Sequence, residues 1–300
     1  MSKKFILIFS FITIVIIVIA FSCNSKEEKK ETQTTGKVNI LVDESVFPII
    51  EDQKLVFESE YDKAKLNLLP MSELEGLDNF LKQKNEVIVL SRILNKQEQA
   101  FFKSKKIKPF QTAVAIDGLA LIKSKTDRDT LVDLAEIINF IQKKPSTLKG
   151  LVFDNPNSSS VRFFKELAKV EEIPTENVYS FKTNAEVIKY VSENKGLIGV
   201  VGMNWLTQPT PEMQNDVDKV SVLSIKNAKN EYVYPTQENI GTLKYPLARH
   251  LYIINCQGSY GLGLGFSAFI SSEVGQRIIL KSGIAPVRMP SRKLVLRKNI

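Results

Sequence analysis

The stretch TAVAIDGLALIKSK, residues 112–125, is a long apolar run that is interrupted in its middle by Asp117 and Gly118. It stands between two regions in which strand and helix patterns alternate. We therefore interpret it as the crossover segment by which the chain leaves a first lobe and enters a second one.

Before this crossover the pattern is βαβαβα. Three apolar runs are typical of buried strands, namely KVNILV (37–42), KLNLLP (65–70) and EVIVLS (86–91). A helical pattern follows each of them, and capping-box patterns at Ser72 with Glu75 and at Asn95 with Glu98 predict where two of these helices begin. This alternation indicates a parallel sheet that is covered by helices on both faces.

After the crossover the alternation resumes. The expected elements are a helix at 131–142, a strand at 148–155, a helix that starts near Ser158, a helix capped by Thr183 and Glu186, strands at 196–205 and 249–256, and a last helix at 271–283. We predict an α/β, two-lobed fold with mostly parallel sheets, helices on both faces and a ligand cleft between the lobes. Lobe 1 would comprise 37–118 and 229–300, and lobe 2 would comprise 119–228.

The N-terminal segment has the pattern of an export signal. Lys3 and Lys4 precede the apolar run Phe5–Phe21, and Ser22-Cys23 resembles the lipobox of bacterial lipoproteins. We expect a signal peptide at 1–22, an acylated (palmitate-bearing) Cys23 and a disordered polar tether at 23–36, with the protein in the cell envelope facing the periplasm or exterior. An uncleaved membrane helix of the same topology is the alternative.

Three strand-to-helix junctions are rich in serine and turn-forming residues. They are VDESVFP (42–48), LSRIL (90–94) and FDNPNSSS (153–160). Helix N-termini carry unpaired N–H groups and a partial positive charge, so such junctions attract anions. At the third junction we expect Asn157 to be the N-cap and Ser158, Ser159 and Ser160 the first turn. Arg162 either pairs with Glu166 or faces a small bound oxyanion.

These junctions together resemble the type II periplasmic binding proteins, most closely the phosphate-binding subunit of ABC importers in its lipoprotein form. ESVFP is similar to the first phosphate loop of that family, NSSS to its Gly-Ser-Gly-Thr loop, GLIGVVGMNW to its Gly-x-Ile-Gly-Tyr strand and SSEVGQRIILKSGIAPV to its closing helix. The resemblance covers roughly residues 37–287. It implies a protein that binds free phosphate between its lobes and delivers it to a membrane permease.

The resemblance also assigns ligand-binding residues. Ser45, Val46 and Phe47 fall on the first loop, Ser91 on the second and Ser158, Ser159 and Ser160 on the third, with Asn157 and Arg162 beside it. The family has an aspartate where Arg92 stands and an arginine where Asp154 stands. If the two positions face each other across the cleft, Arg92 supplies the cation and Asp154 the proton acceptor, and together they form a latch between the lobes.

Other classes of protein fit less well. His250 is the single histidine and Cys256 the single cysteine outside the N-terminal segment, so a zinc site or a histidine-based triad cannot be assembled. We expect no enzyme, no cofactor, no nucleic-acid partner and a monomer. GSYGLGLGF (258–266) does not fit a dinucleotide fingerprint, and we interpret it as a glycine-rich turn. A surface lipoprotein that binds another anion or a protein partner remains the alternative function.

Overall fold

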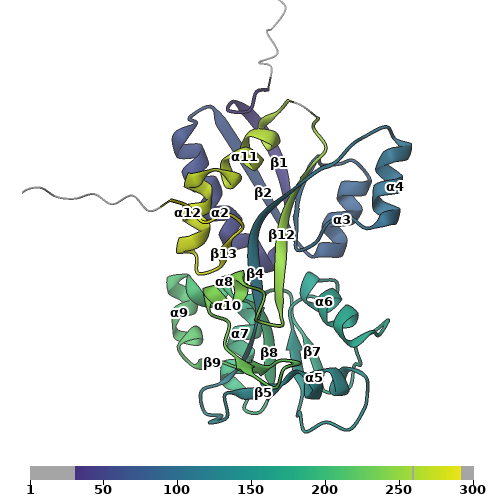
Figure 1. Ribbon diagram of the computed structural model, residues 1–300, viewed down its shortest axis with the longest axis vertical. Coiled ribbons are helices and arrows are strands. Elements are labelled where there is room, and N and C mark those ends of the chain that lie inside the picture. Colours follow the sequence, from purple (N-terminus) through teal and green to yellow (C-terminus); the bar gives the residue numbers. More distant parts are fainter. Residues whose placement is uncertain (1–30, 259, 292–300) are drawn as a thin grey trace, which may run out of the picture. The chain divides into compact units, whose positions relative to one another are not determined.

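The computed structural model of the protein describes residues 31–258 and 260–291. The export signal, Cys23 and most of the expected tether lie outside this range. No helix within the range is both long enough and apolar enough to span a lipid bilayer. Figure 1 shows how the elements are arranged.

The elements follow the alternation that the sequence predicts. Up to the crossover they are β1 (Gly36–Asp43), the 3-10 turn η1 (Glu44–Val46), α2 (Phe47–Glu60), β2 (Ala64–Met71), α3 (Glu73–Leu81), β3 (Val87–Leu90), α4 (Lys96–Ser104) and β4 (Phe110–Ser124). Next come β5 (Leu131–Asp133), α5 (Leu134–Ile141), β6 (Leu151–Phe153), α6 (Ser159–Ala168), β7 (Val178–Ser180), α7 (Asn184–Glu193), β8 (Ile198–Gly202), α8 (Asn204–Thr207) and α9 (Pro211–Val217). The remainder are β9 (Val220–Val222), β10 (Ser224–Lys226), β11 (Tyr232–Val233), α10 (Gln237–Gly241), β12 (Ala248–Asn255), α11 (Leu262–Ser271), α12 (Glu273–Lys281) and β13 (Ala285–Pro286).

The main sheet has the strand order β2-β1-β3-β12-β4-β8-β6-β7. Its outer strands are parallel, as predicted, because β1 pairs with β2 and β3, and β6 pairs with β7 and β8. Its central pairs are antiparallel, because β12 pairs with β3 and β4, and β4 pairs with β8. The sheet is therefore mixed, since the chain enters the second lobe along β4 and returns along β12 in the opposite direction.

The crossover predicted from residues 112–125 is one continuous strand, β4. Val114 and Ala115 pack in the core of the first lobe, whereas Leu119 and Leu121 pack in the core of the second. Gly118 lies at the change of lobe, where a Cβ atom would come within 2.9 Å of the Ile240 side chain. The interruption of the apolar run thus marks the place where the strand passes between two separate cores.

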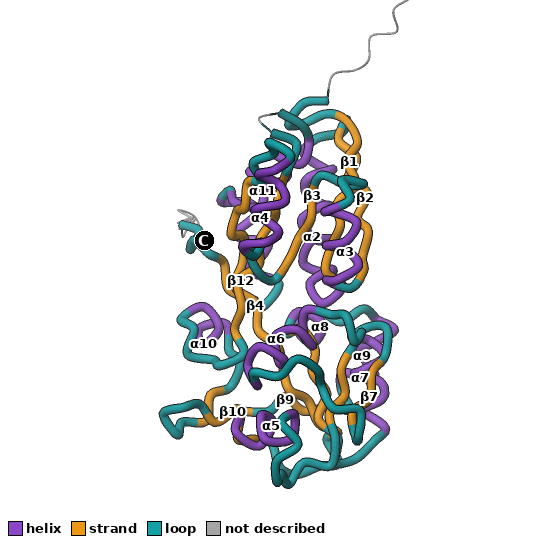
Figure 2. The backbone as a smooth tube through the Cα atoms, turned by 90° about the vertical axis from the view of Figure 1, so that its right-hand side faces the viewer, coloured by secondary structure: helices purple, strands orange, loops and turns teal. Residues whose placement is uncertain are grey.

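Alternation along β1 builds the core of lobe 1 on both faces of the sheet. Ile40 and Val42 pack against α2 and α11 on one face, whereas Leu41 packs against α3 and α4 on the other. Strand β3 divides in the same way. Helices accordingly flank the strands of this lobe on both sides, with α2, α11 and α12 on one side and α3 and α4 on the other in Figure 1, which confirms the predicted layering. Figure 2 shows the same lobe turned by 90°, with α3 and α2 overlapping in the view.

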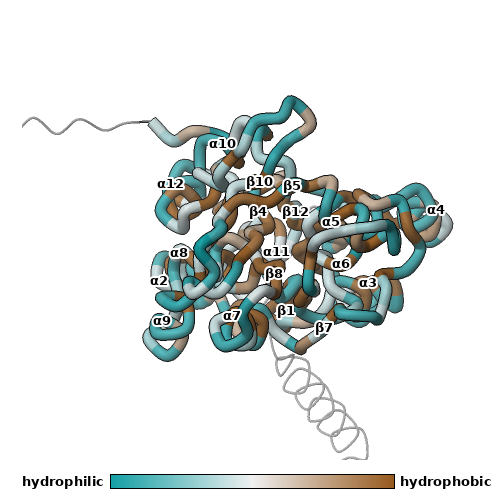
Figure 3. Tube along the Cα trace, turned by 90° about the horizontal axis from the view of Figure 1, so that it is seen from below, coloured by the Kyte–Doolittle hydropathy of each residue, from teal (hydrophilic) through white to brown (hydrophobic). Residues whose placement is uncertain are grey.

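The core of lobe 2 extends further along the chain than the predicted boundary. Val233, Ile240, Tyr245 and Leu247 are buried in the same cluster as β6 and β8. The return to lobe 1 therefore lies within β12 and not at residue 229. In Figure 3, β4 and β8 are coloured as hydrophobic, whereas α9, which has no buried residue, is coloured as hydrophilic.

Of the helix starts predicted from capping patterns in the sequence, two are confirmed and one forms without its cap. The capping boxes of Asn95 with Glu98 and of Thr183 with Glu186 both form. Ser72 precedes α3 as expected, but its side chain makes no cap bond, and the N–H of Leu74 in this first turn donates to the carbonyl of Asn157 instead.

The starts of α6 and α11 differ from the predictions. The N-cap of α6 is Ser158, whose hydroxyl accepts from the Val161 N–H, whereas Asn157 lies one residue too early and is exposed. The glycine-rich stretch 258–266 is only partly a turn. Gly261 has a φ of 114° and leads directly into α11. Within that helix, Gly265 packs so closely against the backbone of Gln33 that a Cβ atom would overlap it.

Candidate anion-binding site between the lobes

Two serines from different lobes meet at the centre of the site. Ser45 lies in η1, directly after β1, and Ser159 is the first residue of α6, directly after β6. Their hydroxyl oxygens are 3.1 Å apart, and both residues are fully buried. The junctions 42–48 and 153–160 are thus brought together as the sequence predicts. Each follows the carboxyl end of a strand in a parallel group, and the two groups run in opposite directions, so these ends face each other.

Arg249 on β12 joins these two serines and is the cation of the site. Its guanidinium donates to Ser159 Oγ and to Ser45 Oγ, each at 2.8 Å, and to Asp117 Oδ2 at 3.0 Å. Asp117 and Arg249 face each other in the β4–β12 register, and their side chains are 0% and 2% exposed. Such a pair is stable in the interior only because each charge has its partner and further hydrogen bonds.

Arg249 is not among the binding residues predicted from the sequence. A signal was present, since Asp117 and Arg249 are opposite charges that each lie within a largely apolar strand segment. Buried charges are expected to be paired, so Asp117 and Arg249 could be predicted to form an ion pair with each other. The pairing itself depends on the antiparallel register of β4 and β12, which a parallel-sheet interpretation does not predict.

Asp43 orients the hydroxyl of Ser45. Its Oδ1 accepts from the Ser45 N–H at 3.1 Å and from Ser45 Oγ at 2.9 Å. Because Ser45 donates its hydroxyl proton to Asp43, Ser159 is the donor in the bond between the two serines. Burial raises the pKa of Asp43, and its Oδ2 is buried without a hydrogen-bond partner. Asp43 therefore has a free acceptor atom beside the serine pair.

Asp154 and Glu44 add two more carboxyl groups at the edge of the serine pair. Asp154 accepts from Ser158 Oγ and, at 3.2 Å, from Asn184 Nδ2. Glu44 of lobe 1 also contacts Asn184, and its carboxylate accepts from Asn184 Nδ2 at 2.6 Å. Burial raises the pKa of Glu44 to about 8 and that of Asp154 to about 7, and repulsion between the two carboxylates contributes to the pKa of Glu44.

The predicted contact between Arg92 and Asp154 does not form. Arg92 donates to Glu73 Oε1 at 3.0 Å and makes a two-pronged pair with Glu98 at 2.8 and 2.9 Å. Asp154 lies among hydroxyl and amide donors instead. The swap predicted from the resemblance is therefore wrong as a contact, because Arg92 has nearer carboxylates in its own lobe.

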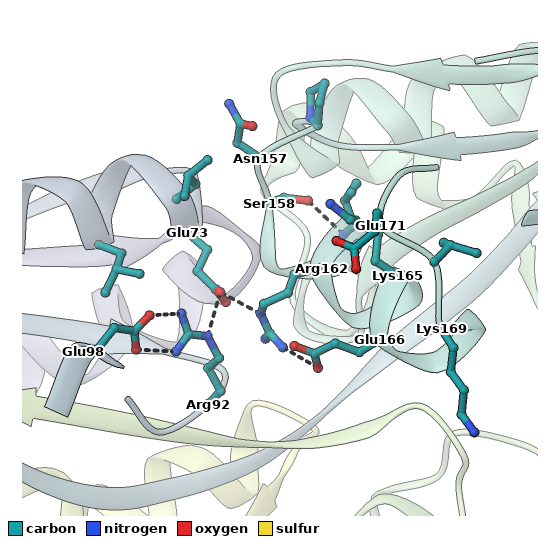
Figure 4. A pocket seen from close by; sticks show the side chains of 15 residues that line it. Glu73, Arg92, Glu98, Asn157, Ser158, Arg162, Lys165, Glu166, Lys169 and Glu171 are labelled. Atoms are coloured by element: carbon teal, nitrogen blue, oxygen red, sulfur yellow. Dashed lines mark hydrogen bonds and ion pairs between the residues drawn. The ribbon is translucent and has the colours of Figure 1, made fainter. Parts of the chain in front are cut away.

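A different ion pair connects the lobes at this place. Arg162 of α6 donates through Nε to Glu73 Oε1 at 2.6 Å and through Nη2 to Ser91 Oγ at 3.0 Å. It also pairs with Glu166, as the simpler of the two sequence interpretations held. Figure 4 shows Glu73 between Arg92 and Arg162. These residues belong to the lining of a cavity of about 650 Å³, which Ser158 also lines.

The remaining residues that the resemblance assigns to the ligand lie partly in the core, partly at the start of α6 and partly at the surface. Val46 is buried in the core of lobe 1, and the Phe47 N–H donates to the Glu44 carbonyl. Ser158 caps α6 and contacts Asp154, while the Asn157 side chain is exposed. Ser160 is fully buried, and its hydroxyl has no hydrogen-bond partner among residues 31–258 and 260–291, so it remains able to bind a ligand.

The arrangement can hold a small oxyanion. Hydroxyl groups, the first N–H groups of α6 and one guanidinium converge where the lobes touch. Three contacts join the lobes there. They are the Arg162–Glu73 pair, the Asn184–Glu44 hydrogen bond and the hydrogen bond from the Trp205 indole N–H to the Ser45 carbonyl at 3.1 Å. Carboxyl groups in the same place can accept the proton of a protonated anion. A hydrogen bond to a charged group contributes more to the free energy of binding at such a buried site than it does at a solvent-exposed one.

Comparisons with known proteins agree with this geometry. Residues 27–274 match the model of the PBP superfamily domain. The phosphate-binding protein PstS of Borreliella burgdorferi is 24% identical over 306 residues, which cover 96% of this chain and 100% of that protein. A solved structure of a putative phosphate ABC transporter substrate-binding protein with bound phosphate, from Clostridium perfringens, is similar with a TM-score of 0.70 at 20% identity, covering 84% of this chain and 100% of the other.

A second solved structure, PstS from Borrelia burgdorferi, has a TM-score of 0.52 at 22% identity and covers 84% of this chain and 99% of the other. These structural similarities concern the fold. The match to the family model covers most of the length of the chain and confirms the kind of protein that the sequence motifs predict. The chain therefore belongs to the PBP superfamily.

Proposed function

We propose that the protein captures inorganic phosphate, or a similar small oxyanion, between its lobes and delivers it to an ABC importer of the membrane. The observation that carries this proposal is the convergence of Ser45, Ser159 and Arg249, three donors from lobe 1, lobe 2 and the connecting strand, within hydrogen-bond distance of one another. An anion that replaces the contact between the serines would be bound by both lobes at once and would favour their closure.

The surroundings favour a protonated anion over a fully ionised one. Asp43 and Asp154 offer acceptor atoms in a buried setting, where sulfate, which carries no proton at neutral pH, would meet them without a compensating hydrogen bond. Hydrogen phosphate carries one proton that a carboxylate can accept. The relatives named above as phosphate-binding proteins support the same choice of ligand.

A calorimetric titration of the purified full-length chain tests the proposal. We expect phosphate to bind with micromolar or tighter affinity, and sulfate and a phosphonate to bind at least about a hundredfold more weakly, which corresponds to about 2.7 kcal/mol. Ser159→Asp should abolish binding, because the new carboxylate would occupy the place of the anion beside Arg249. Ser59→Asp, which adds the same charge at an exposed position of α2, is the matched control. Equal binding of sulfate, or no binding of phosphate, would contradict the proposal.

We further propose that acylated Cys23 anchors the protein to the membrane and that it acts there as a monomer. Cys23→Ala should release soluble protein or leave the unprocessed precursor, which membrane fractionation and the mass of the mature chain distinguish. Unchanged fractionation with an unchanged mature mass would contradict the anchor. A concentration-dependent mass in light scattering would contradict the monomer.

A further inference from the structure

Glu44 and Asp154 bring carboxyl groups from different lobes to one amide. Glu44 follows β1 in lobe 1, and Asp154 follows β6 in lobe 2. Asn184 Nδ2 donates to both of them, at 2.6 Å to Glu44 and at 3.2 Å to Asp154, and the Asn184 N–H donates to Glu44 as well. Asn184 Oδ1 accepts from the Gly202 N–H at 2.8 Å, which fixes the orientation of the amide. Both carboxyl groups therefore converge on the same donor.

Within the part of the chain that the structure describes, the groups around this pair do not supply a free cation. Asp43 is a further carboxyl group nearby, and Ser158 and Asn184 are neutral. Arg249 is the charged group of opposite sign that acts on Asp154, but its guanidinium is already shared by Asp117, Ser45 and Ser159. Two ionised carboxylates at one amide in a buried place repel each other and lose hydration, and both effects are relieved if one of them is protonated.

Adding an anion to the site increases the electrostatic repulsion that favours protonation of one of the two carboxylates. A phosphate bound at Ser45 and Ser159 would bring further negative charge to a place that already holds Asp43, Asp117, Glu44 and Asp154 against Arg249. When the lobes are apart, Glu44 no longer meets Asp154 and water can solvate both groups. Closure and the uptake of a proton are therefore linked.

We propose that Glu44 and Asp154 hold one proton between them when the lobes are closed around an anion, so that capture takes up a proton from solution. The proton goes from the solvent to a carboxylate oxygen of this pair, and no other bond is made or broken. The part that concerns capture rests on the proposed function. It makes Glu44, which the motif comparison does not assign, a determinant of how tightly the anion is held at a given pH.

The linkage has a definite sign. In the closed protein the pair binds one more proton than when the lobes are apart, so affinity for the anion falls as pH rises. The fall should approach about tenfold per pH unit between roughly pH 5 and pH 8 and level off above that range. Release of the anion would return the proton to the solvent.

Calorimetry in buffers of different ionisation enthalpy measures the number of protons that phosphate binding takes up. Phosphate itself exchanges protons near neutral pH, and comparing variants with the same ligand cancels this contribution. At pH 6.5 to 7.5 we expect the full-length protein to take up about one proton more than Glu44→Gln or Asp154→Asn, since either substitution removes one member of the pair. Glu60→Gln, an exposed position at the end of α2, should behave as the unaltered protein.

A second measurement follows Glu44 itself. In protein labelled with ¹³C at the glutamate carboxyl, the resonance that is missing from Glu44→Gln should titrate near pH 8 when phosphate holds the lobes closed, and in the ordinary range of glutamate in the ligand-free protein. In Asp154→Asn with phosphate it should also move towards that ordinary range. A Glu44 resonance that titrates near pH 4 to 5, both with and without phosphate, would overturn the proposal, as would equal proton uptake by all variants. Failure of phosphate to bind would instead contradict the proposed function, and a Glu44 resonance that still titrates near pH 8 in the ligand-free protein would show that the pair holds its proton without an anion.

Discussion

Arg249 and Asp117 face each other on β12 and β4, the two strands that connect the lobes, and the guanidinium of Arg249 contacts Asp117, Ser45 and Ser159 at once. One side chain thus links the connecting strands to the helix starts of both lobes. This position explains why a cation is tolerated in a strand whose neighbours are buried. It also means that the residue acts on both stability and ligand binding.

Removal of Arg249 should therefore be costly. We expect Arg249→Met to lower the free energy of unfolding by about 3 to 5 kcal/mol, because it leaves Asp117 buried without a partner. Adding Asp117→Leu should recover much of this loss, whereas phosphate binding should stay lost in both variants. Urea denaturation and calorimetry measure the two effects. Recovery of binding in the double variant would contradict the assignment of Arg249 as the cation of the site.

A double-mutant cycle compares the ion pair that forms with the one that the sequence predicted. For Glu73→Gln and Arg162→Met we expect a coupling energy above about 1 kcal/mol in phosphate binding, because the pair joins the lobes in the closed state. For Arg92→Met and Asp154→Asn the coupling should stay below about 0.5 kcal/mol. The reverse order of the two values would restore the swapped pair as the latch.

The hydroxyl of Ser160 is buried without a hydrogen-bond partner, so removing it tests whether it is kept for a ligand. Ser160→Ala should leave the free energy of unfolding unchanged or slightly raised, since an unsatisfied polar group is lost. Its phosphate affinity should fall about tenfold, the equivalent of one hydrogen bond to an anion. Ser59→Ala, at an exposed position of α2, is the control. Unaltered affinity would show that Ser160 does not contact the ligand.

Gly202 at the end of β8 lies against the backbone of the other lobe. A Cβ atom there would come within 2.5 Å of the Ser45 carbonyl oxygen, so Gly202→Ala should prevent full closure. We expect a folded protein with weakened phosphate binding and a larger radius of gyration in X-ray scattering with phosphate present. Gly76→Ala, whose new methyl would meet flexible side chains at 3.4 Å, is the matched control. Normal closure of Gly202→Ala would mean that the lobes touch less closely than described.

Stability should also depend on pH. The pKa of Glu44 is raised to about 8 and that of Asp154 to about 7, so the folded protein binds more protons than the unfolded chain from about pH 5 to pH 8. The free energy of unfolding is then highest at the acidic end of this window and falls as pH rises through it. We expect a loss of about 2 kcal/mol between pH 5.5 and pH 8.5, since opening of the lobes limits the effect. Glu44→Gln should flatten this profile in urea denaturation, and an unaltered slope would exclude Glu44 as its source.

Local sequence patterns were sufficient to predict the helices and strands and much of their placement. Apolar alternation and helical spacing located the strands and helices around the crossover, since these periods follow from local backbone geometry. The junctions after β1 and β6 could be selected because carboxyl ends of parallel strands lie at one edge of a sheet. Ser45 and Ser159 were selected in this way, but their contact also requires that the strand groups of β1 and β6 run in opposite directions, so that their carboxyl ends face each other between the lobes.

Which charged side chains pair with one another depends on the tertiary structure. Arg92 pairs with Glu73 and Glu98 and not with Asp154, and Arg249 reaches both serines because β12 runs antiparallel to β4 in one particular register. A charged side chain can choose among several partners within its reach. The choice depends on distances between segments that are far apart in sequence, and no local pattern encodes those distances.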